Sequence, residues 1–526
     1  MSSDRATYSQ ISRATAIIVG LTLVDKLLAV GKEMLMAHRF GVSRDLDAFN
    51  IALAFPGVLI LFLSGAIISA VVPLYSEWTI NDSPGEASNR AVRLFYALVL
   101  FFSIMALAAF AASPSIIAVM GYGFDAEVKG LAVTLQRFLV LLIVLDGVGI
   151  IVRGLLQAKK SFFGLSAAPI FVNLLIIVML VIGKELGIGA LLWGTLVGTL
   201  CKTAYMVLLL VREGVRLLPM GLPSRETLST FLLLAVPLVG SELMANSNLL
   251  VDQAMATQLA AGSVSTLRYA YRINDLPVQV VIMAISRSIF PFAAEQSLAE
   301  DRSPLRRLFK HSVIVLAFLT FPLMGFTVLF SEQIVAVLLQ RGAFLPEATR
   351  ETAGTLACFS SGLFFYAYTF VNGTFFSAMR DTRTLFLMGC LSVVLNVAFN
   401  VLFIRWIGVK GIALSSAVTL GILSSLFIIL LTRRLQFHDF ADLWRCLLRL
   451  AAAAGLMAMI GYGLKQIGLF AQAPPLIALL VSAILLAVTY LTAVRVGSSP
   501  EIAASLALLI SPDRIPRPLA FLWAGK

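Results

Sequence analysis

Charged side chains are scarce in this sequence: Asp, Glu, Lys and Arg make up 13% of its 526 residues, whereas 59% of the residues are hydrophobic. A soluble domain of this composition would expose more apolar surface than water tolerates, so a water-soluble globular protein is excluded. Apolar runs longer than the roughly 20 residues needed to span a bilayer recur along nearly the whole chain. The sequence therefore predicts an all-α polytopic membrane protein, with no segment left for a sizeable soluble domain.

Cysteine and histidine are also rare. The four cysteines have no paired spacing and lie in or beside apolar stretches, which argues against a disulfide framework and a metal site. They are Cys201, Cys358, Cys390 and Cys446. The three histidines are scattered, which argues against a metalloenzyme. They are His38, His311 and His438.

Sequence motifs of catalysis are missing as well. No G-x-x-x-x-G-K-[ST] loop is present, which excludes a pump with its own ATPase domain. No Ser-His-Asp or two-carboxylate constellation stands out, so we expect a protein that is not an enzyme and has no cofactor. The polar N-terminus leads straight into an apolar stretch, and we expect no removed signal peptide. Transport driven by an ion gradient, or passive exchange, is the class of function that is left.

Hydropathy predicts fourteen membrane spans. They cover residues 15–37, 47–75, 91–112, 131–156, 166–182, 188–211, 227–259, 264–290, 308–330, 349–378, 384–404, 410–431, 446–464 and 475–494. Lysine and arginine concentrate in the even-numbered connections and near both ends, as at Arg13, Arg90, Arg153, Lys159 and Arg433. Because cytoplasmic loops carry the excess of basic residues, we expect both termini in the cytoplasm.

A weak internal repeat recurs at an offset of about 220 residues. Pro56, Pro73 and Glu77 are echoed by Pro277, Pro291 and Glu295, and other pairs follow in the same order. The copies share one orientation, as in transporters with parallel repeats. This predicts a six-helix lobe at 1–220, a second at 221–437, and two additional helices with a cytoplasmic tail at 438–526. Chance similarity between apolar sequences is the alternative.

The first span carries four charged residues, Asp25, Lys26, Lys32 and Glu33. Seven residues return almost to the same helix face, so Asp25 lies below Lys32, and Lys26 below Glu33. Charges at membrane depth are costly unless they face a partner or a wet cavity. The stripe therefore indicates a hydrated interior that handles a polar cargo. A self-neutralising structural network is the alternative.

Other polar residues cluster in three further spans. The eighth span carries Arg268, Arg272 and Asp275 on one face, the seventh carries Asp252, and the eleventh carries Asn396 and Asn400. Lys26, Lys32 and Arg272 would suit an anionic, phosphorylated substrate. Asp252 and the two asparagines could supply oxygen ligands for Na⁺, or Asp252 could carry a proton. Pairing of Arg272 with Asp275, and hydrogen bonding of the asparagines between helices, are the structural alternatives.

Two stretches resemble a known family. Residues 39–49 (RFGVSRDLDAF), followed by Phe55-Pro56, Ser64-Gly65-Ala66 and residues 72–77 (VPLYSE), are similar to the N-terminal signature of the MviN/MurJ family. Ser263-Val264-Ser265, residues 269–272 (YAYR) and Leu276-Pro277 are similar in the second repeat. Members of this family are lipid II flippases of the multidrug/oligosaccharidyl-lipid/polysaccharide exporter superfamily. The resemblance implies alternating access that moves a polyprenyl-diphosphate-linked precursor outward across the bacterial inner membrane.

The family's site residues carry over unevenly. Its two first-span arginines fall on Lys26 and Lys32, whereas its acidic residue after the Phe-Gly turn matches Asp47, and its eighth-span arginine matches Arg272. The second-span arginine falls near Ile60 and Leu61, and the acidic residue before Gly-Ala is Ser64. The resemblance also implies a Na⁺ site. Its ligands would be Asp252, Asn396, Asn400 and Thr419.

Lipid II is thus the expected cargo, and cell-wall or polysaccharide synthesis machinery is the expected partner; no nucleic-acid partner is expected. Because a cavity without arginine forks could prefer another cargo, a flippase for an exopolysaccharide or O-antigen unit is the first alternative. A cation-coupled drug antiporter is the second, although cationic cargo would be repelled by Lys26, Lys32 and Arg272. A membrane scaffold that transports nothing is the third. The coupling ion, Na⁺ or H⁺, stays open.

Overall fold

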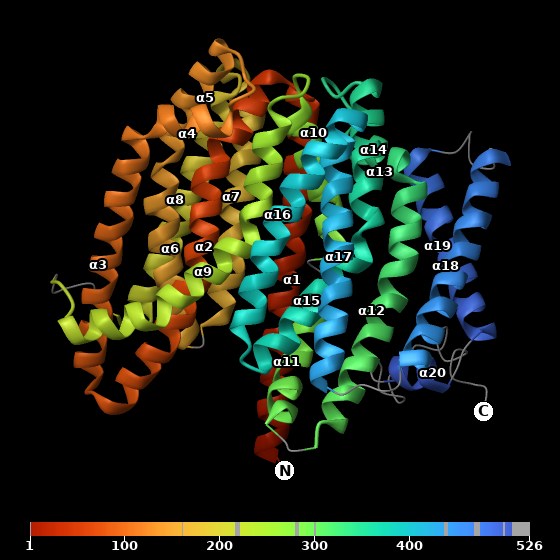
Figure 1. The fold of residues 1–526 in the computed structure, drawn as a ribbon. Helices are drawn as coiled ribbons and strands as arrows, with labels where there is room; N and C mark the ends of the chain where they lie inside the picture. The colour runs from red at the N-terminus through yellow and green to blue at the C-terminus, as the bar shows by residue number, and fades with distance from the viewer. Residues whose placement is uncertain are drawn as a thin grey trace. The chain divides into compact units, whose positions relative to one another are not determined.

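The computed structural model describes residues 2–159, 161–215, 221–278, 283–298, 301–435, 440–467, 474–497 and 500–507. Within these ranges the chain forms twenty α-helices and one short 3₁₀ helix, and no strand (Figure 1). The all-α fold class is confirmed.

The chain divides into two compact units. Unit 1 comprises residues 1–265 and Arg341–Phe344, and unit 2 comprises residues 266–340 and 345–526. Helices of unit 1 are α1 (Ser2–Phe40), α2 (Arg44–Asn81), α3 (Pro84–Ala111), α4 (Ser113–Met120), α5 (Ala126–Leu139), α6 (Leu141–Ala158), α7 (Phe162–Ile182), η1 (Lys184–Leu186), α8 (Gly189–Arg212) and α9 (Arg225–Ala256). The division into repeats at residues 220 and 437 stays a prediction, because these units are defined by compactness.

Most of α10 (Ser263–Pro277) belongs to unit 2. Its other helices are α11 (Met283–Ser297), α12 (Ser303–Leu329), α13 (Ser331–Leu339), α14 (Pro346–Ser361), α15 (Leu363–Ala378), α16 (Thr382–Ile407), α17 (Val409–Leu435), α18 (Phe440–Ile467), α19 (Pro475–Val496) and α20 (Pro500–Ala507). Helix α20 was not anticipated, because its residues were assigned to the cytoplasmic tail.

Ten described helices are long and apolar enough to cross a membrane, and the bent pair α14–α15 makes eleven. They correspond to all the predicted spans except the first, seventh and eighth. The first span lies in α1. The predicted eighth span ends as a helix at Pro277, and α11 begins separately at Met283.

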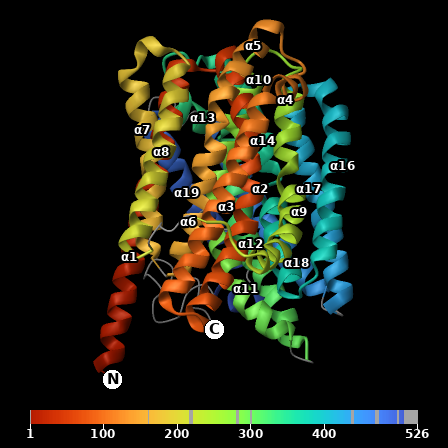
Figure 2. The same cartoon turned by 90° about the vertical axis from the view of Figure 1, so that its left-hand side faces the viewer.

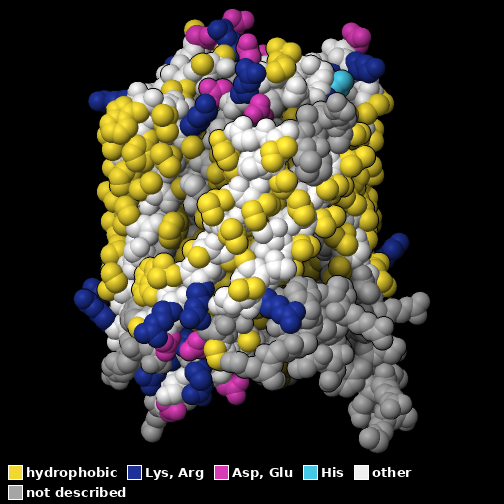
Figure 3. Space-filling view, turned by 90° about the vertical axis from the view of Figure 1, so that its right-hand side faces the viewer, with side chains coloured by type: hydrophobic (Ala, Val, Ile, Leu, Met, Phe, Trp, Pro, Cys, Tyr) yellow, Lys and Arg dark blue, Asp and Glu magenta, His cyan; other side chains and the backbone are white. Residues whose placement is uncertain are grey.

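Surface composition agrees with a membrane environment. On the face that carries α18 and α19, hydrophobic side chains form a broad band, and Lys and Arg gather toward its two ends (Figure 3). Exposed hydrophobic side chains of α18 and α19 include Leu456, Met459, Ile484 and Val488. Such a large exposed apolar surface is stable only against lipid.

Small residues set the packing inside unit 1. Helices α7 and α8 lie side by side (Figures 1 and 2). A methyl group on Gly198 would lie 2.9 Å from the Val172 Cα, and one on Gly194 would lie 2.9 Å from the Ile176 Cα. The two backbones can approach this closely only because both residues lack a side chain.

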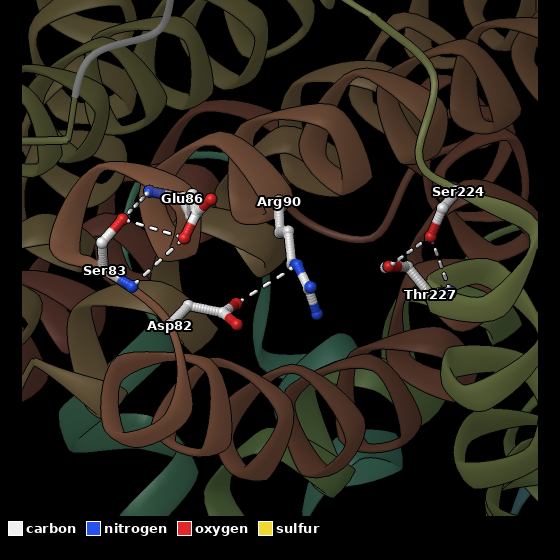
Figure 4. A network of polar contacts seen from close by, with 6 residues as sticks. All are labelled: Asp82, Ser83, Glu86, Arg90, Ser224 and Thr227. Atoms are coloured by element: carbon white, nitrogen blue, oxygen red, sulfur yellow. Dashed lines mark hydrogen bonds and ion pairs between the residues drawn. The ribbon is translucent and has the colours of Figure 1, made fainter.

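Side-chain caps fix the helix ends in the connection between α2 and α3. Ser83 and Glu86 form a capping box at the start of α3, with the Ser83 hydroxyl 3.0 Å from Glu86 Oε2 (Figure 4). Arg90 lies 3.2 Å from Asp82 of the same connection. At the start of α9, the Ser224 hydroxyl accepts a hydrogen bond from the Thr227 amide (Figure 4). These caps satisfy backbone groups that a helix end leaves unpaired.

An aromatic core holds unit 2 together. Phe309 of α12 packs edge-on against Phe375 of α15, with ring centroids 5.4 Å apart, and Tyr368 stacks on Phe364 at 5.9 Å. Leu450 and Met457 of α18 and Tyr490 of α19 belong to the same core. The two helices that follow the predicted lobes are therefore packed parts of unit 2.

Candidate substrate and cation sites

Helix α1 presents the predicted charged stripe in one unbroken helix. Asp25 accepts a hydrogen bond of 2.9 Å from the side-chain amide of Asn173 on α7. Lys32 lies 3.4 Å from Glu33, and both side chains are 17% exposed. Lys26 is also partly buried. The network is therefore partly self-neutralising, yet each charged group stays accessible from one side.

Asp47 lies in the first turn of α2 and is 2% exposed. Its carboxylate accepts hydrogen bonds from the Gly262 amide (2.7 Å), the Ser265 amide (2.7 Å) and the Ser265 hydroxyl (2.5 Å). Asn50, one turn further on, donates to the same hydroxyl at 3.3 Å. Asp47 thus caps the start of α10 in this structure, a role that the sequence did not indicate.

Asp252 lies near the end of α9 and is 7% exposed. Earlier on α9, Glu242 reaches α2, where its carboxylate lies directly against Gly65. Any side chain at position 65 would displace that carboxylate. Beyond Glu226 in its first turn, α9 therefore carries two further acidic groups, Glu242 and Asp252, within unit 1.

Helix α10 carries all three polar residues that the sequence placed on one face, but their surroundings differ. Asp275 is 8% exposed, and it hydrogen-bonds with the Tyr366 hydroxyl. Arg272 is exposed, and it forms no hydrogen bond or ion pair with any residue in the described part of the chain. Arg268 is partly buried. The structural alternative for Arg272, pairing with Asp275, is not observed.

A buried polar cluster joins α16 and α17. Asn396 and Asn400 are 0% exposed and Thr419 is 1% exposed. The Asn400 amide donates to Asn396 Oδ1 at 3.2 Å, and the Ser415 hydroxyl donates to the Asn396 carbonyl at 3.1 Å. The Thr419 hydroxyl and the Asn396 amide nitrogen have no hydrogen-bond partner among the described residues. A buried hydroxyl without a partner among the described residues is an oxygen ligand of the kind that a hard monovalent cation prefers.

These candidates fall into two groups. Asp25, Lys26, Lys32, Glu33, Asp47 and Asp252 belong to unit 1, and Arg268, Arg272, Asp275, Asn396, Asn400 and Thr419 belong to unit 2. Their convergence on one cleft stays a prediction.

A sequence model of the lipid II flippase MurJ family matches residues 36–480. The match covers most of the chain, including α2, α9, α10, α16 and α17. The chain belongs to the lipid II flippase MurJ family.

Curated proteins that are similar to this chain carry the same family description. The chain is 28% identical over 462 residues to a probable lipid II flippase MurJ of Rhizobium meliloti, with 85% of each chain covered. It is 26% identical over 493 residues to a lipid II flippase MurJ of Burkholderia cenocepacia, covering 90% of this chain and 95% of the relative.

Solved structures show the same fold. A lipid II flippase MurJ in an inward closed conformation superposes with a TM-score of 0.78 at 23% identity, covering 91% of this chain and 98% of that one. An inward-facing multidrug resistance MATE family transporter of the MOP superfamily gives a TM-score of 0.68 at 14% identity, with 80% and 98% covered.

Sequence reasoning missed one charged pair of this MurJ family member. Lys202 of α8 donates a hydrogen bond to Asp146 of α6, and both side chains are partly buried. A signal was available, because Asp146 and Arg153 are seven residues apart inside one predicted span. That is the spacing which drew attention to the first span.

Proposed function

We propose that this chain is a lipid II flippase of the bacterial inner membrane, with both termini in the cytoplasm. The match to the family over residues 36–480 carries the proposal. The diphosphate of the cargo would bind near Lys26, Lys32 and Arg272, while the polyprenyl tail stays in lipid. The exposed guanidinium of Arg272, which has no hydrogen bond or ion pair with the described residues, supports this assignment, because guanidinium groups bind phosphate oxygens directly.

The remaining candidates would shape this site. Asp25, Glu33, Arg268 and Asp275 would position the cations and balance their charge, and Asp47 would hold the start of α10 in one of the transport states. A closed state needs contacts that an open state gives up, and hydrogen bonds accepted by a single carboxylate are such contacts.

A coupling cation is part of the proposal. Asp252, Asn396, Asn400 and Thr419 would hold Na⁺, with protonation of Asp252 as the other form of coupling. The buried hydroxyl of Thr419, which has no partner among the described residues, supports Na⁺. Such an ion would bias transport by binding one state more tightly than the other.

Reconstituted vesicles test the function. Purified protein in vesicles with fluorescent lipid II is expected to move the label between leaflets faster than empty vesicles do. Labelled lipid II that stays at the background rate would overturn the proposal. A complementation assay in a flippase-depleted strain gives the cellular counterpart.

A second candidate cargo is another polyprenyl-diphosphate-linked glycan. Ile60, Leu61 and Ser64 stand where the resemblance places an arginine and an acidic residue, and this departure favours a cavity with different selectivity. Running the same vesicle assay with an exopolysaccharide precursor separates the two cargoes. Synthesis machinery for the cargo that moves faster would be the partner.

A further inference from the structure

The Asp146–Lys202 ion pair links α6 and α8 within unit 1, where the side chain of Lys202 is 21% exposed and that of Asp146 is 23% exposed. Both residues lie well inside segments that are long and apolar enough to span a membrane, Ala126–Ala158 and Gly189–Arg212. The Thr203 hydroxyl donates to the Leu145 carbonyl at 2.9 Å, which fixes the two helices beside the pair.

The pair lies on the faces of α6 and α8 that point away from exposed apolar side chains. At about 100° per residue, Lys202 is about 160° around α8 from Leu200, and Asp146 is about 140° around α6 from Leu141. Leu200 is 52% exposed and Leu141 is 51% exposed. Charged residues in membrane helices face the bundle interior or water. The exposed part of the pair therefore faces a hydrated interior.

Polar residues extend this face along both helices. Arg153 and Gln157 follow Asp146 at seven and eleven residues, and both are partly buried. Thr195 and Thr199 precede Lys202 at seven and three residues, with exposures of 8% and 3%. By the expected topology, Arg153 lies nearer the cytoplasmic end of α6 than Asp146 does. Lys202, which pairs with Asp146, and Arg153 therefore lie one after the other toward the cytoplasmic end of the two helices.

Both cations keep hydrogen-bond donors for a ligand. Lys202 has three N–H donors, and its one hydrogen bond with a described residue is to Asp146. Arg153 forms no hydrogen bond or ion pair with the described residues.

We propose that Arg153 and Lys202 form a second anion-binding stripe of unit 1, which contacts the diphosphate of the cargo on its path from the cytoplasmic side. Asp146 is a positioning residue that holds the Lys202 ammonium in place through their ion pair. The proposal rests on the proposed flippase function, because it assumes a polyprenyl diphosphate as cargo. A purely structural clasp between α6 and α8 is the competing explanation.

Binding of a short probe tests the stripe. Farnesyl diphosphate and farnesol are titrated against purified protein in lipid nanodiscs. The double variant Asp146→Asn/Lys202→Met removes the charges together and leaves no unpaired ion. It is expected to weaken farnesyl diphosphate binding about tenfold, the loss of one charged hydrogen bond, and to leave farnesol binding unchanged. Unchanged binding of the diphosphate would show a clasp and overturn the proposal.

Arg153→Gln supplies the second test, because it breaks no pair and should not affect folding. Arg212→Gln, at the exposed end of α8, is the control with the same charge change. Arg153→Gln is expected to slow lipid II movement in vesicles, whereas Arg212→Gln should leave it unchanged. Equal rates of lipid II movement for the two variants would overturn the proposal. Wild-type protein that moves no lipid II would instead overturn the proposed function.

Discussion

Arg272 shows how the surroundings of a single residue decide its role. Its sequence neighbour on the helix face, Asp275, is engaged with Tyr366, so the guanidinium remains available to a ligand. Lys32, by contrast, has Glu33 beside it at 3.4 Å. From residue type alone, Arg272 and Lys32 would have been judged equally available to an anionic ligand.

Replacing Arg272 or Lys32 by alanine is expected to abolish complementation of a flippase-depleted strain at normal membrane abundance, because each change removes a cation from the proposed diphosphate site. Arg272→Lys should retain part of the activity, since it keeps the charge and loses the planar fork. Full rescue by both alanine variants would rule out the cationic site.

Asp47 makes a prediction about stability. Asp47→Ala removes the acceptor of three hydrogen bonds and leaves the buried amides of Gly262 and Ser265 without that partner. An unsatisfied buried donor costs about 1–3 kcal/mol, so the thermal midpoint of the purified protein should fall. Asp45→Ala, two residues away at an exposed position, is the control and should leave the midpoint in place.

At the scale of helices, the end of α7 depends on a residue from α1. The Arg39 guanidinium donates to the carbonyls of Leu180 (2.8 Å), Gly183 (2.5 Å) and Lys184 (2.6 Å), which a helix C-terminus leaves unpaired. This fork explains why a basic residue occurs on the predicted outer side, where Lys and Arg are fewer.

Arg39→Lys is expected to destabilise the protein nearly as much as Arg39→Ala does, because a single ammonium cannot reach three carbonyls in this geometry. The matched control is Arg44→Ala, whose ion pair with Asp125 is exposed and contributes little. The stability of each variant is measured by thermal unfolding, monitored through tryptophan fluorescence. A full rescue by lysine would show that charge alone matters.

The crossing of α7 and α8 gives a second prediction for helices. Gly198→Ala should destabilise the unit by about 1–3 kcal/mol, because the new methyl group meets the α7 backbone at Val172. Gly130→Ala in α5 meets no atom within 4 Å and should be neutral or stabilising. If both variants unfold at the same temperature, close packing does not hold the two helices together.

For the molecule as a whole, the buried polar cluster of α16 and α17 predicts a response to sodium. Thermal stability should rise with NaCl but not with choline chloride, because an ion bound only to the folded state stabilises it by about 2.7 kcal/mol at 100 times its dissociation constant. Thr419→Val and Asp252→Asn should each remove the difference between the two salts. A difference that survives both substitutions would place sodium elsewhere.

Much of this protein followed from the sequence. The fold class follows because lipid cannot hydrogen-bond with backbone N–H and C=O groups. Long apolar runs must therefore form helices, in which these groups pair with one another. Eleven of the predicted spans correspond to helices or a helix pair that pass the length and composition test. The family also followed, because the Arg39–Phe49 stretch and its continuation are specific. Side-chain roles followed less well, since spacing assigns a helix face but not what lies opposite it.

Only the tertiary structure showed that Asp47 caps α10, that Arg39 caps α7, and that Lys202 pairs with Asp146. Each contact joins residues far apart in the sequence, and hydrogen bonds of this kind depend on distances of a few tenths of an ångström. Hydrophobicity and helical periodicity act locally along the chain, so the sequence alone determined the helices. The partners of each charge depend on how those helices pack, and the folded structure alone decided them.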